Sequence, residues 1–512
     1  MRGPHNILRL IRTGATFERS GAMALALNAL EAPASIRISA RILIWPFKIL
    51  GLKGDIKYSP VLRALIALGP AYIKFGQLLS TRPDVVGKEL AAELSILQDA
   101  LPPFSQKQAI KAVEGELSIK IEDVFIDFKL PIAAASLAQV HKATVTATGQ
   151  VVAVKVLRPG IEKAFLRDID AFYFIARFIE VLSPSSRRLK PVEVIKYFEG
   201  IVREEIDLRM ESAAAAEFFS NTKEDKDFKV PQVVWNLSGK RVMTTEWVDG
   251  IALSDIKALK KQGINLTELA RLIIQSFLRH ALRDGFFHAD MHQGNLRCAK
   301  SGQLIVMDFG IMGRIDLYTR RVYAEILNGF ISKNYRRVAE VHFEAGYVGY
   351  EEDMDKFAQA LRSVGEPIFG MEANQISMAK LLAHLFEVTE RFGMQVRTEL
   401  LLLQRTMVVV EGVARSLDPN MNIWEVARPE VTSYIKESLG PKAILKDLAQ
   451  SAKAIAKFGP HAPYLIEKSL RNALDFKPPK PYRRRLPALI GGVLLGLILG
   501  SMSILLLLLW LD

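Results

Sequence analysis

The chain has 512 residues, of which 50% are hydrophobic and 24% charged, and its formal net charge is +13. This length and hydrophobic content exclude a wholly disordered chain and predict more than one compact domain. The single cysteine, Cys298, excludes an internal disulfide framework, and we interpret it as a packing residue. Because the basic residues lie beside apolar segments, and no nucleic-acid module is recognisable, we expect anionic lipid as the partner and no nucleic acid.

Residues 1–60 mix Arg and Lys with apolar residues, most clearly in the stretch Ile36–Lys48. Cations at helical spacing beside apolar side chains predict a helix that lies on an anionic membrane surface. Three other interpretations stay open: a signal-peptide core at Gly21–Leu30, an Arg-rich transit peptide, and a helix that packs on the next domain.

Residues 61–120 are predicted to be helical, with a break at Gly69-Pro70. Lys74 and Gln77 lie within this region, in the run Lys-Phe-Gly-Gln. Their spacing taken alone indicates an ordinary pair on a helix surface.

A short β-branched strand, Val151–Val156, carries one long cation, Lys155. In protein kinases a Val-Ala-Ile-Lys strand brings its lysine to the α and β phosphates of ATP. The glycine-rich loop that should precede this strand has alanine at all three glycine positions. Because alanine lacks the positive-φ freedom of glycine, this loop must hold a nucleotide differently. The loop residues are Ala133, Ala134, Ala135, Ser136, Leu137, Ala138, Gln139 and Val140.

A helix over about 192–220 is predicted to carry three acidic residues, Glu205, Asp207 and Glu211. Asp207 and Glu211 would share one helix face, since they are four residues apart, whereas Glu205 would point elsewhere. Four further elements are predicted before the segment that begins at His288. They are a hairpin turn near Thr148–Gln150, a helix over Ile161–Leu182, strand character over Val230–Val248, with Thr244–Gly250 where a kinase has the hinge between its lobes, and a helix over Leu266–Asp284.

The segment from His288 to Gly310 carries the strongest chemical signal. Asp290 and Asn295 have the spacing of the catalytic loop His-Arg-Asp-x-x-x-x-Asn of protein kinases. A β-strand's length of apolar residues follows, and then Asp308-Phe309-Gly310, in which the aspartate of a kinase holds Mg²⁺. Asp308 supplies a hard anionic oxygen, which is the ligand type that Mg²⁺ prefers. We therefore predict a phosphoryl-transfer site.

The chain lacks the activation segment of protein kinases. A helical segment, Arg320–Ile331, begins about ten residues after Gly310, and no Ala-Pro-Glu sequence follows. That segment is the platform on which a protein substrate docks, so this pattern argues against phosphorylation of proteins in trans. The remainder, to about residue 475, is predicted to be mostly helical and includes an apolar stretch at Leu400–Val413.

Residues Leu486–Leu511 carry no charge, and Arg483–Arg485 stand directly before them. A helix of this length would be about 39 Å long, against a hydrocarbon core of about 30 Å. We expect a single span, with the arginines and the catalytic domain on the cytoplasmic side of the cell inner membrane.

Together, the alanine-rich loop, the Val-Ala-Val-Lys strand, His-x-Asp-x-His-x-Gly-Asn, Asp-Phe-Gly and the Lys-x-Gly-Gln run resemble the UbiB family of atypical kinases, which includes the mitochondrial coenzyme Q kinases. The resemblance covers about residues 60–420. It implies an α+β fold: an atypical two-lobe protein-kinase-like fold with an N-terminal helical extension, a helical C-lobe and one C-terminal transmembrane helix. The expected domains are a basic amphipathic segment (1–60), the Lys-x-Gly-Gln extension (61–120), the N-lobe (121–250), the C-lobe with a helical extension (251–475) and a basic linker with the tail (476–512).

The resemblance also implies roles for individual residues. It pairs Lys155 with Glu211 beside the phosphates of ATP, and Lys74 with Glu205 in a regulatory Lys-x-Gly-Gln region that packs across the mouth of the site and includes Gln77 and Asp207. It makes Asn295 and Asp308 the Mg²⁺ ligands, and Asp290 the base or water-positioning residue.

By resemblance, the function is Mg²⁺-dependent ATP binding, with ATPase or kinase activity that supports ubiquinone biosynthesis. The implied partners are membrane lipid, prenylated phenol or quinone precursors, and other ubiquinone-biosynthesis enzymes. Two alternatives stay open: a small-molecule or lipid phosphotransferase, and a nucleotide-binding scaffold for biosynthetic enzymes. A direct hydroxylase lacks support, because we find no flavin fingerprint and no redox-metal ligand set in the sequence.

Overall fold

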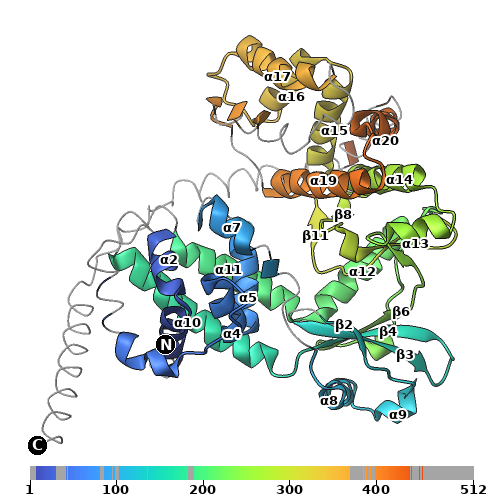
Figure 1. Cartoon of the computed structure of the whole chain (residues 1–512). Coiled ribbons are helices and arrows are strands. Elements are labelled where there is room, and N and C mark those ends of the chain that lie inside the picture. The colour runs from blue at the N-terminus through green and yellow to red at the C-terminus, as the bar shows by residue number, and fades with distance from the viewer. Residues whose placement is uncertain are drawn as a thin grey trace, which may run out of the picture. The chain divides into compact units, whose positions relative to one another are not determined.

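The computed structural model describes residues 7–29, 44–80, 86–94, 103–134, 137–182, 190–369 and 398–438, with a few short stretches and single positions besides. The chain divides into two compact units, Met1–Leu439 and Gly440–Asp512, and the elements named below lie in the first (Figure 1). The predicted tail Leu486–Leu511, with Arg483–Arg485, lies outside the described residues. Among the residues that are described, no helix has the length and apolar character needed to cross a membrane.

The N-lobe is built on an antiparallel sheet in which the strands follow the order β1-β3-β4-β6, with β2 paired to β3. The turn between β3 and β4 lies where the sequence predicted it, and Gly149 there adopts a positive φ of 69°. The strands are β1 (Phe125–Ile126), β2 (Pro131–Ala134), β3 (Ala138–Val145), β4 (Val151–Leu157) and β6 (Val242–Glu246).

The alternation of side chains along β4 decides which of them enter the core of the N-lobe. Val152, Val154 and Val156 are fully buried and share a core cluster with Ala109 and Val113 of α8 (Gln106–Leu117). Lys155 therefore points from the opposite face of the sheet, because successive side chains on a strand alternate. Helix α8 begins with a complete capping box formed by its N-cap serine, and the short α9 (Ile121–Val124) leads from it to β1.

Most of the remaining N-terminal half is helical. The predicted break at Gly69-Pro70 is present, since α4 ends at Leu68 and α5 begins at Pro70. The predicted helix Ile161–Leu182 is found with those bounds as α10, and it packs against α5, α11 and α1. The helices of this region are α1 (Ile7–Ser20), α2 (Ala22–Ala29), η2 (Trp45–Leu50), α4 (Pro60–Leu68), α5 (Pro70–Ser80), α7 (Lys88–Leu94), α10 and α11 (Pro191–Glu205).

The first helix favours one of the interpretations left open for residues 1–60. Thr13, Ala15 and Thr16 of α1 are buried, and the helix packs on α4, η2 and α10. Arg9 also forms an ion pair with the buried Asp168 of α10. Residues 7–20 are therefore a helix packed on the next domain, whereas the side chains of η2 are exposed.

The predicted single helix over 192–220 is wrong, because the structure has two helices there. Helix α11 ends at Glu205, and Asp207 is the N-cap of α12 (Leu208–Thr222), where its carboxylate accepts a hydrogen bond from the Arg209 amide. An aspartate that bonds the backbone in this way starts a helix rather than continuing one. Asp207 and Glu211 consequently do not share the face of one continuous helix.

The C-lobe combines helices with two small sheets, β5-β10-β9-β7 and β11-β8. The predicted helix Leu266–Asp284 is present as α14, with its last turn, η6, π-helical. Much of the predicted strand Val230–Val248 is instead loop and a short 3₁₀ turn, with strand only at β6 and a single bridge at Val233. The helices are α13 (Ile256–Lys261), α14 (Leu266–Arg279), η6 (His280–Asp284), α15 (Leu317–Ile331), α16 (Tyr335–Glu344), α17 (Met354–Phe369), α19 (Thr398–Leu417) and α20 (Ile423–Ser438); the strands are β5 (Phe228–Lys229), β7 (Ile251–Ala252), β8 (Phe286–His288), β9 (Leu296–Cys298), β10 (Leu304–Val306) and β11 (Met312–Arg314).

Candidate active site

Lys155 forms the centre of an ion-pair cluster that joins the two lobes. Its Nζ lies 2.6 Å from Glu211 Oε1 on α12 and 3.3 Å from Asp308 Oδ2. Burial opposes the charge on Lys155, but the carboxylates of Asp308 and Glu211 raise the pKa of its ammonium above the ordinary value. Burial also raises the pKa of Glu211, although the positive charge of Lys155 acts in the opposite direction.

Asp308 is held in an uncommon backbone conformation, with φ at 62°. Aspartate and asparagine are among the few residues other than glycine that occupy this left-handed region. Asp308 Oδ1 accepts a hydrogen bond from the Gly310 amide at 3.2 Å, and Glu211 Oε1 accepts one from the Phe309 amide at 3.4 Å. The charge of Lys155 lowers the pKa of Asp308 to about 2, so this carboxylate is ionised at neutral pH. Its side chain keeps 48% of its surface exposed.

The catalytic loop is tied together by its own polar groups. Asn295 Nδ2 donates to the Asp290 carbonyl at 3.0 Å and to Asp290 Oδ2 at 3.2 Å. His292 Nε2 also lies 3.5 Å from Asp290 Oδ2. These contacts aim Asp290 and Asn295 at one small region, as their spacing predicts.

The alanine-rich stretch lies in the paired strands β2 and β3, next to the strand that carries Lys155. Ala133 and Ala134 end β2 and pair with Val140 and Gln139 of β3, while Ala135 and Ser136 at the tip lie outside the described residues. The return strand begins at Ala138, and both Ala138 and the preceding Leu137 are buried. The β3–β4 register places Val140 directly beside Lys155. Strand β3, which follows the alanine-rich tip, therefore lies next to the strand that carries the lysine, as in the phosphate loop of a kinase.

The Lys-x-Gly-Gln helix makes the second ion pair that the resemblance implies. Lys74 Nζ on α5 lies 2.5 Å from Glu205 Oε1 at the end of α11. Gln77 Nε2 donates to the Leu97 carbonyl at 2.9 Å. Helix α5 packs on α4, α7 and α10, and its predicted packing across the mouth of the site stays a prediction.

Comparison with known proteins places this arrangement in a family. Residues 96–342 match the family described as the ABC1 atypical kinase-like domain, and residues 361–422 match the UbiB helical domain. The chain is 38% identical over 413 residues to "Probable protein kinase UbiB" of Aliivibrio fischeri strain MJ11, covering 80% of this chain and 76% of that protein. It is 36% identical over 432 residues to the protein of the same name from Marinobacter nauticus, covering 83% and 79%.

The chain belongs to the UbiB family. It is therefore of the atypical kinase, or phosphotransferase, class. A solved structure, that of Mycobacterium tuberculosis Rv3197 in complex with erythromycin, is similar over 70% of this chain and 91% of that one, with a TM-score of 0.50 and 24% identity. This likeness supports the atypical kinase-like α+β fold and nothing beyond it.

The donor set at Asp308 and Asn295 fits the Mg²⁺ that a kinase-like site uses. The side-chain nitrogen of Asn295 donates to two oxygen acceptors of Asp290, so the side-chain oxygen of Asn295 faces away from Asp290. A half-exposed, ionised Asp308 and an amide oxygen together offer hard oxygen ligands. Asn295 is further fixed by the Met307 amide, which donates to its carbonyl at 2.9 Å.

Sequence reasoning gave His288 no role, although it begins the loop motif. Its ring is buried between the two halves of the site: Nε2 donates to the Asp308 carbonyl at 2.6 Å, and Nδ1 accepts from the Asp290 amide at 3.2 Å. Burial lowers the pKa of His288, which keeps it neutral and suits this pair of bonds. His288 thus connects Asp308 to the loop that carries Asp290.

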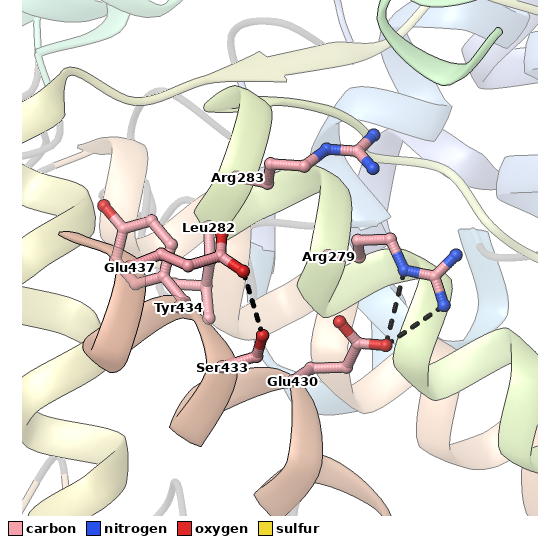
Figure 2. Close-up of a pocket in the computed structure, with 7 residues that line it drawn as sticks. All are labelled: Arg279, Leu282, Arg283, Glu430, Ser433, Tyr434 and Glu437. Atoms are coloured by element: carbon pink, nitrogen blue, oxygen red, sulfur yellow. Dashed lines mark hydrogen bonds and ion pairs between the residues drawn. The ribbon is translucent and has the colours of Figure 1, made fainter. Parts of the chain in front are cut away.

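A separate hollow lies between η6 and α20, away from these residues (Figure 2). Arg279 spans it by donating to Glu430 at 3.0 Å, and Ser433 donates to Glu437 at 3.2 Å. Because none of the residues described above lines this hollow, we do not assign it to the candidate active site. Its lining residues are Arg279, Leu282, Arg283, Glu430, Ser433, Tyr434 and Glu437.

Proposed function

We propose that this chain is a membrane-anchored, Mg²⁺-dependent ATPase or kinase that supports ubiquinone biosynthesis. The observation that carries the ATP-binding part is the cluster of Lys155 with Glu211 and Asp308. In an active kinase, the lysine of the N-lobe strand must pair with a helix glutamate while the Asp-Phe-Gly aspartate is in place. Here both conditions are met in one arrangement.

The proposed mechanism assigns one task to each group. Lys155 leaves part of its interaction with Asp308 to bind the α and β phosphates, while Glu211 keeps its ammonium in position. Asn295 and Asp308 would hold Mg²⁺, which would supply positive charge to offset that of the phosphates. Asp290 accepts the proton of the attacking group or orients a water molecule, and its bond from Asn295 keeps the carboxylate in the loop.

The acceptor of the phosphoryl group is proposed to be water or a small molecule. Only Ile311–Asp316 separate Gly310 from α15, and within them β11 pairs with β8. This short connection stands where protein kinases have the segment on which a protein substrate docks. The same feature supports the second candidate function, phosphoryl transfer to a small molecule or lipid, and the phosphorylated product distinguishes the two.

The decisive experiment incubates purified full-length chain with γ-labelled ATP and Mg²⁺, with and without a phenolic quinone-precursor mimic. We expect release of labelled phosphate, and at least about a hundredfold less release for Asp290→Asn, since the neutral amide neither accepts a proton nor orients water equally well. Label in the mimic would establish the phosphotransferase. ATP binding without release or transfer by the wild type under any condition would reject the proposal in favour of a nucleotide-binding scaffold.

The proposed membrane anchoring has two supports. One is the uncharged sequence Leu486–Leu511. The other is an exposed surface on η2, where Trp45 is 70% and Ile49 86% exposed and Lys48 lies between apolar side chains. Contiguous exposed apolar residues interleaved with lysine are typical of a surface that enters the headgroup region of an anionic bilayer.

This surface predicts a measurable lipid dependence. The double variant Trp45→Ser, Ile49→Ser of residues 1–475 is expected to bind vesicles containing anionic lipid about tenfold more weakly, because two interfacial side chains are lost. Tyr350→Ser is the matched control, since Tyr350 is 83% exposed on another part of the chain. Binding is measured by co-sedimentation. Equal binding by the double variant and the control would remove η2 from the membrane surface.

The biosynthetic role rests on family membership. The names of the relatives record a kinase and no substrate. We propose prenylated phenols or quinone precursors in the membrane, and other ubiquinone-biosynthesis enzymes, as the partners. Deleting the gene in a ubiquinone-producing host is expected to lower the ubiquinone content, and Asp308→Asn is expected not to restore it. Undiminished ubiquinone in the deletion strain would contradict this role.

A further inference from the structure

Helix α19 lies against the catalytic loop and contacts it on both sides of Asp290. Thr406 Oγ1 donates to the Ala289 carbonyl at 3.1 Å, and Gln293 Nε2 donates to Ser416 Oγ at 2.7 Å. Ala289 and Gln293 bracket Asp290 in the chain. Helix α19 belongs to the matched UbiB helical domain rather than to the kinase-like domain, so the two contacts join one matched domain to the catalytic loop of the other.

The Thr406 contact completes the backbone hydrogen bonding around Asp290. The Ala289 amide donates to the Ile311 carbonyl at 3.0 Å, and the Asp290 amide donates to His288 Nδ1. The Asp290 carbonyl accepts from Asn295 Nδ2. Ala289 and Asp290 together have four backbone polar groups, and the fourth of these, the Ala289 carbonyl, accepts a hydrogen bond from Thr406. This carbonyl belongs to the peptide plane that joins Ala289 to Asp290, so its partner helps to set the direction of the Asp290 side chain.

Thr406 is buried and firmly placed. It is fully shielded from solvent, and it lies on the same face of α19 as Leu403, Val410 and Ala414, which are also buried. That face packs against α14. The hydroxyl proton is shared between two carbonyl oxygens, because Oγ1 also lies 2.8 Å from the Leu402 carbonyl of its own helix. In the second contact, Ser416 Oγ donates to the Val413 carbonyl of its own helix while it accepts from Gln293.

We propose that Thr406 is a positioning residue for the catalytic loop, acting through the Ala289 carbonyl to hold Asp290, with Ser416 as a second, weaker support through Gln293. The inference rests on the proposed phosphoryl-transfer function for its effect on rate. It gives the UbiB helical domain a specific task, which is to hold the catalytic loop in position.

The test compares three variants of the full-length chain. Thr406→Val keeps the shape but loses the hydroxyl, whereas Thr406→Ser keeps the hydroxyl but leaves a small cavity. Thr222→Val is the matched control, because Thr222 is also buried in a helix and its hydroxyl donates to its own helix carbonyl at Phe218. The readouts are the kcat and KM of phosphate release, the melting temperature, and the amide hydrogen exchange of the peptide 288–296.

Thr406→Val is expected to lower kcat about tenfold, with the KM for ATP within about twofold, since a misplaced catalytic group loses rate while nucleotide contacts persist. Its 288–296 peptide is expected to exchange at least about threefold faster. Thr406→Ser is expected to keep kcat within about twofold even where its melting temperature falls below that of Thr406→Val. Ser416→Ala is expected to lower kcat about threefold.

The outcomes separate this inference from the proposed function. If Thr406→Val matches Thr222→Val in kcat and in exchange of residues 288–296, the positioning role is overturned. A loss of kcat in Thr406→Ser as large as in Thr406→Val would also overturn it, because packing alone would then explain the effect. If the wild type releases no phosphate but Thr406→Val still speeds amide hydrogen exchange in the 288–296 peptide, the proposed function fails while the positioning role of Thr406 is supported.

Discussion

Asp308→Asn is expected to leave the fold intact and to reduce phosphate release about a thousandfold. The fold tolerates the change because asparagine also adopts the positive φ of 62° that Asp308 has. The activity is lost because a neutral amide cannot replace an ionised ligand to Mg²⁺ or the charge that faces Lys155. Phosphate release and the melting temperature are measured on the same preparations.

The chain contains a matched control for this change. Asp127 also has a positive φ, of 57°, but lies in the exposed loop after β1. Asp127→Asn is therefore expected to keep both the melting temperature and the rate close to wild type. Rates for Asp308→Asn within about fivefold of the wild type would show that Asp308 does not hold the metal in the reacting complex.

Lys155→Met is expected to abolish ATP binding and to lower the free energy of unfolding by about 3 kcal/mol. The side chain of Glu211 is only 10% exposed, so removing its partner leaves a carboxylate with little access to water. Asp308 is half exposed and regains hydration, and therefore adds little to this loss. Urea unfolding and nucleotide titration measure the two effects separately.

A second substitution tests whether the unpaired charge of Glu211 causes the loss of stability in Lys155→Met. The double variant Lys155→Met, Glu211→Gln is expected to recover most of the lost stability but no ATP binding, because the buried charge is gone while the phosphate contact stays missing. Lys229→Met is the matched control, since Lys229 pairs with Glu246 at 2.7 Å where both are partly exposed. It is expected to cost about 1 kcal/mol or less. Equal losses for Lys155→Met and Lys229→Met would mean that Glu211 is not charged in the fold.

Local patterns were sufficient to predict the elements that carry the candidate active site. The β-branched apolar run Val151–Val156 predicted a strand that carries Lys155, and the structure has that strand as β4. The loop spacing of Asp290 and Asn295 corresponds to a direct hydrogen bond between their side chains. In both cases the signal lies within a few neighbouring residues, where strand period and loop geometry act directly.

Predictions that depended on the path of the chain were less successful. The helix over 192–220 was divided by Asp207, because capping competes with helix continuation and propensity does not decide between them. The basic apolar sequence of residues 1–60 did not show that α1 would be buried and Trp45 exposed, because both segments have the same kind of composition. Both depend on which surfaces α4 and α10 leave open.

The sequence by itself determined the family and predicted which residues form the phosphate site, because both are written in short motifs and their spacing. Only the tertiary structure decided that His288 joins Asp290 to Asp308, that Glu205 and Glu211 lie on separate helices, and that Thr406 reaches the Ala289 carbonyl. The last two residues are 117 positions apart. A contact at that separation is created by helix packing and leaves no pattern in either local sequence.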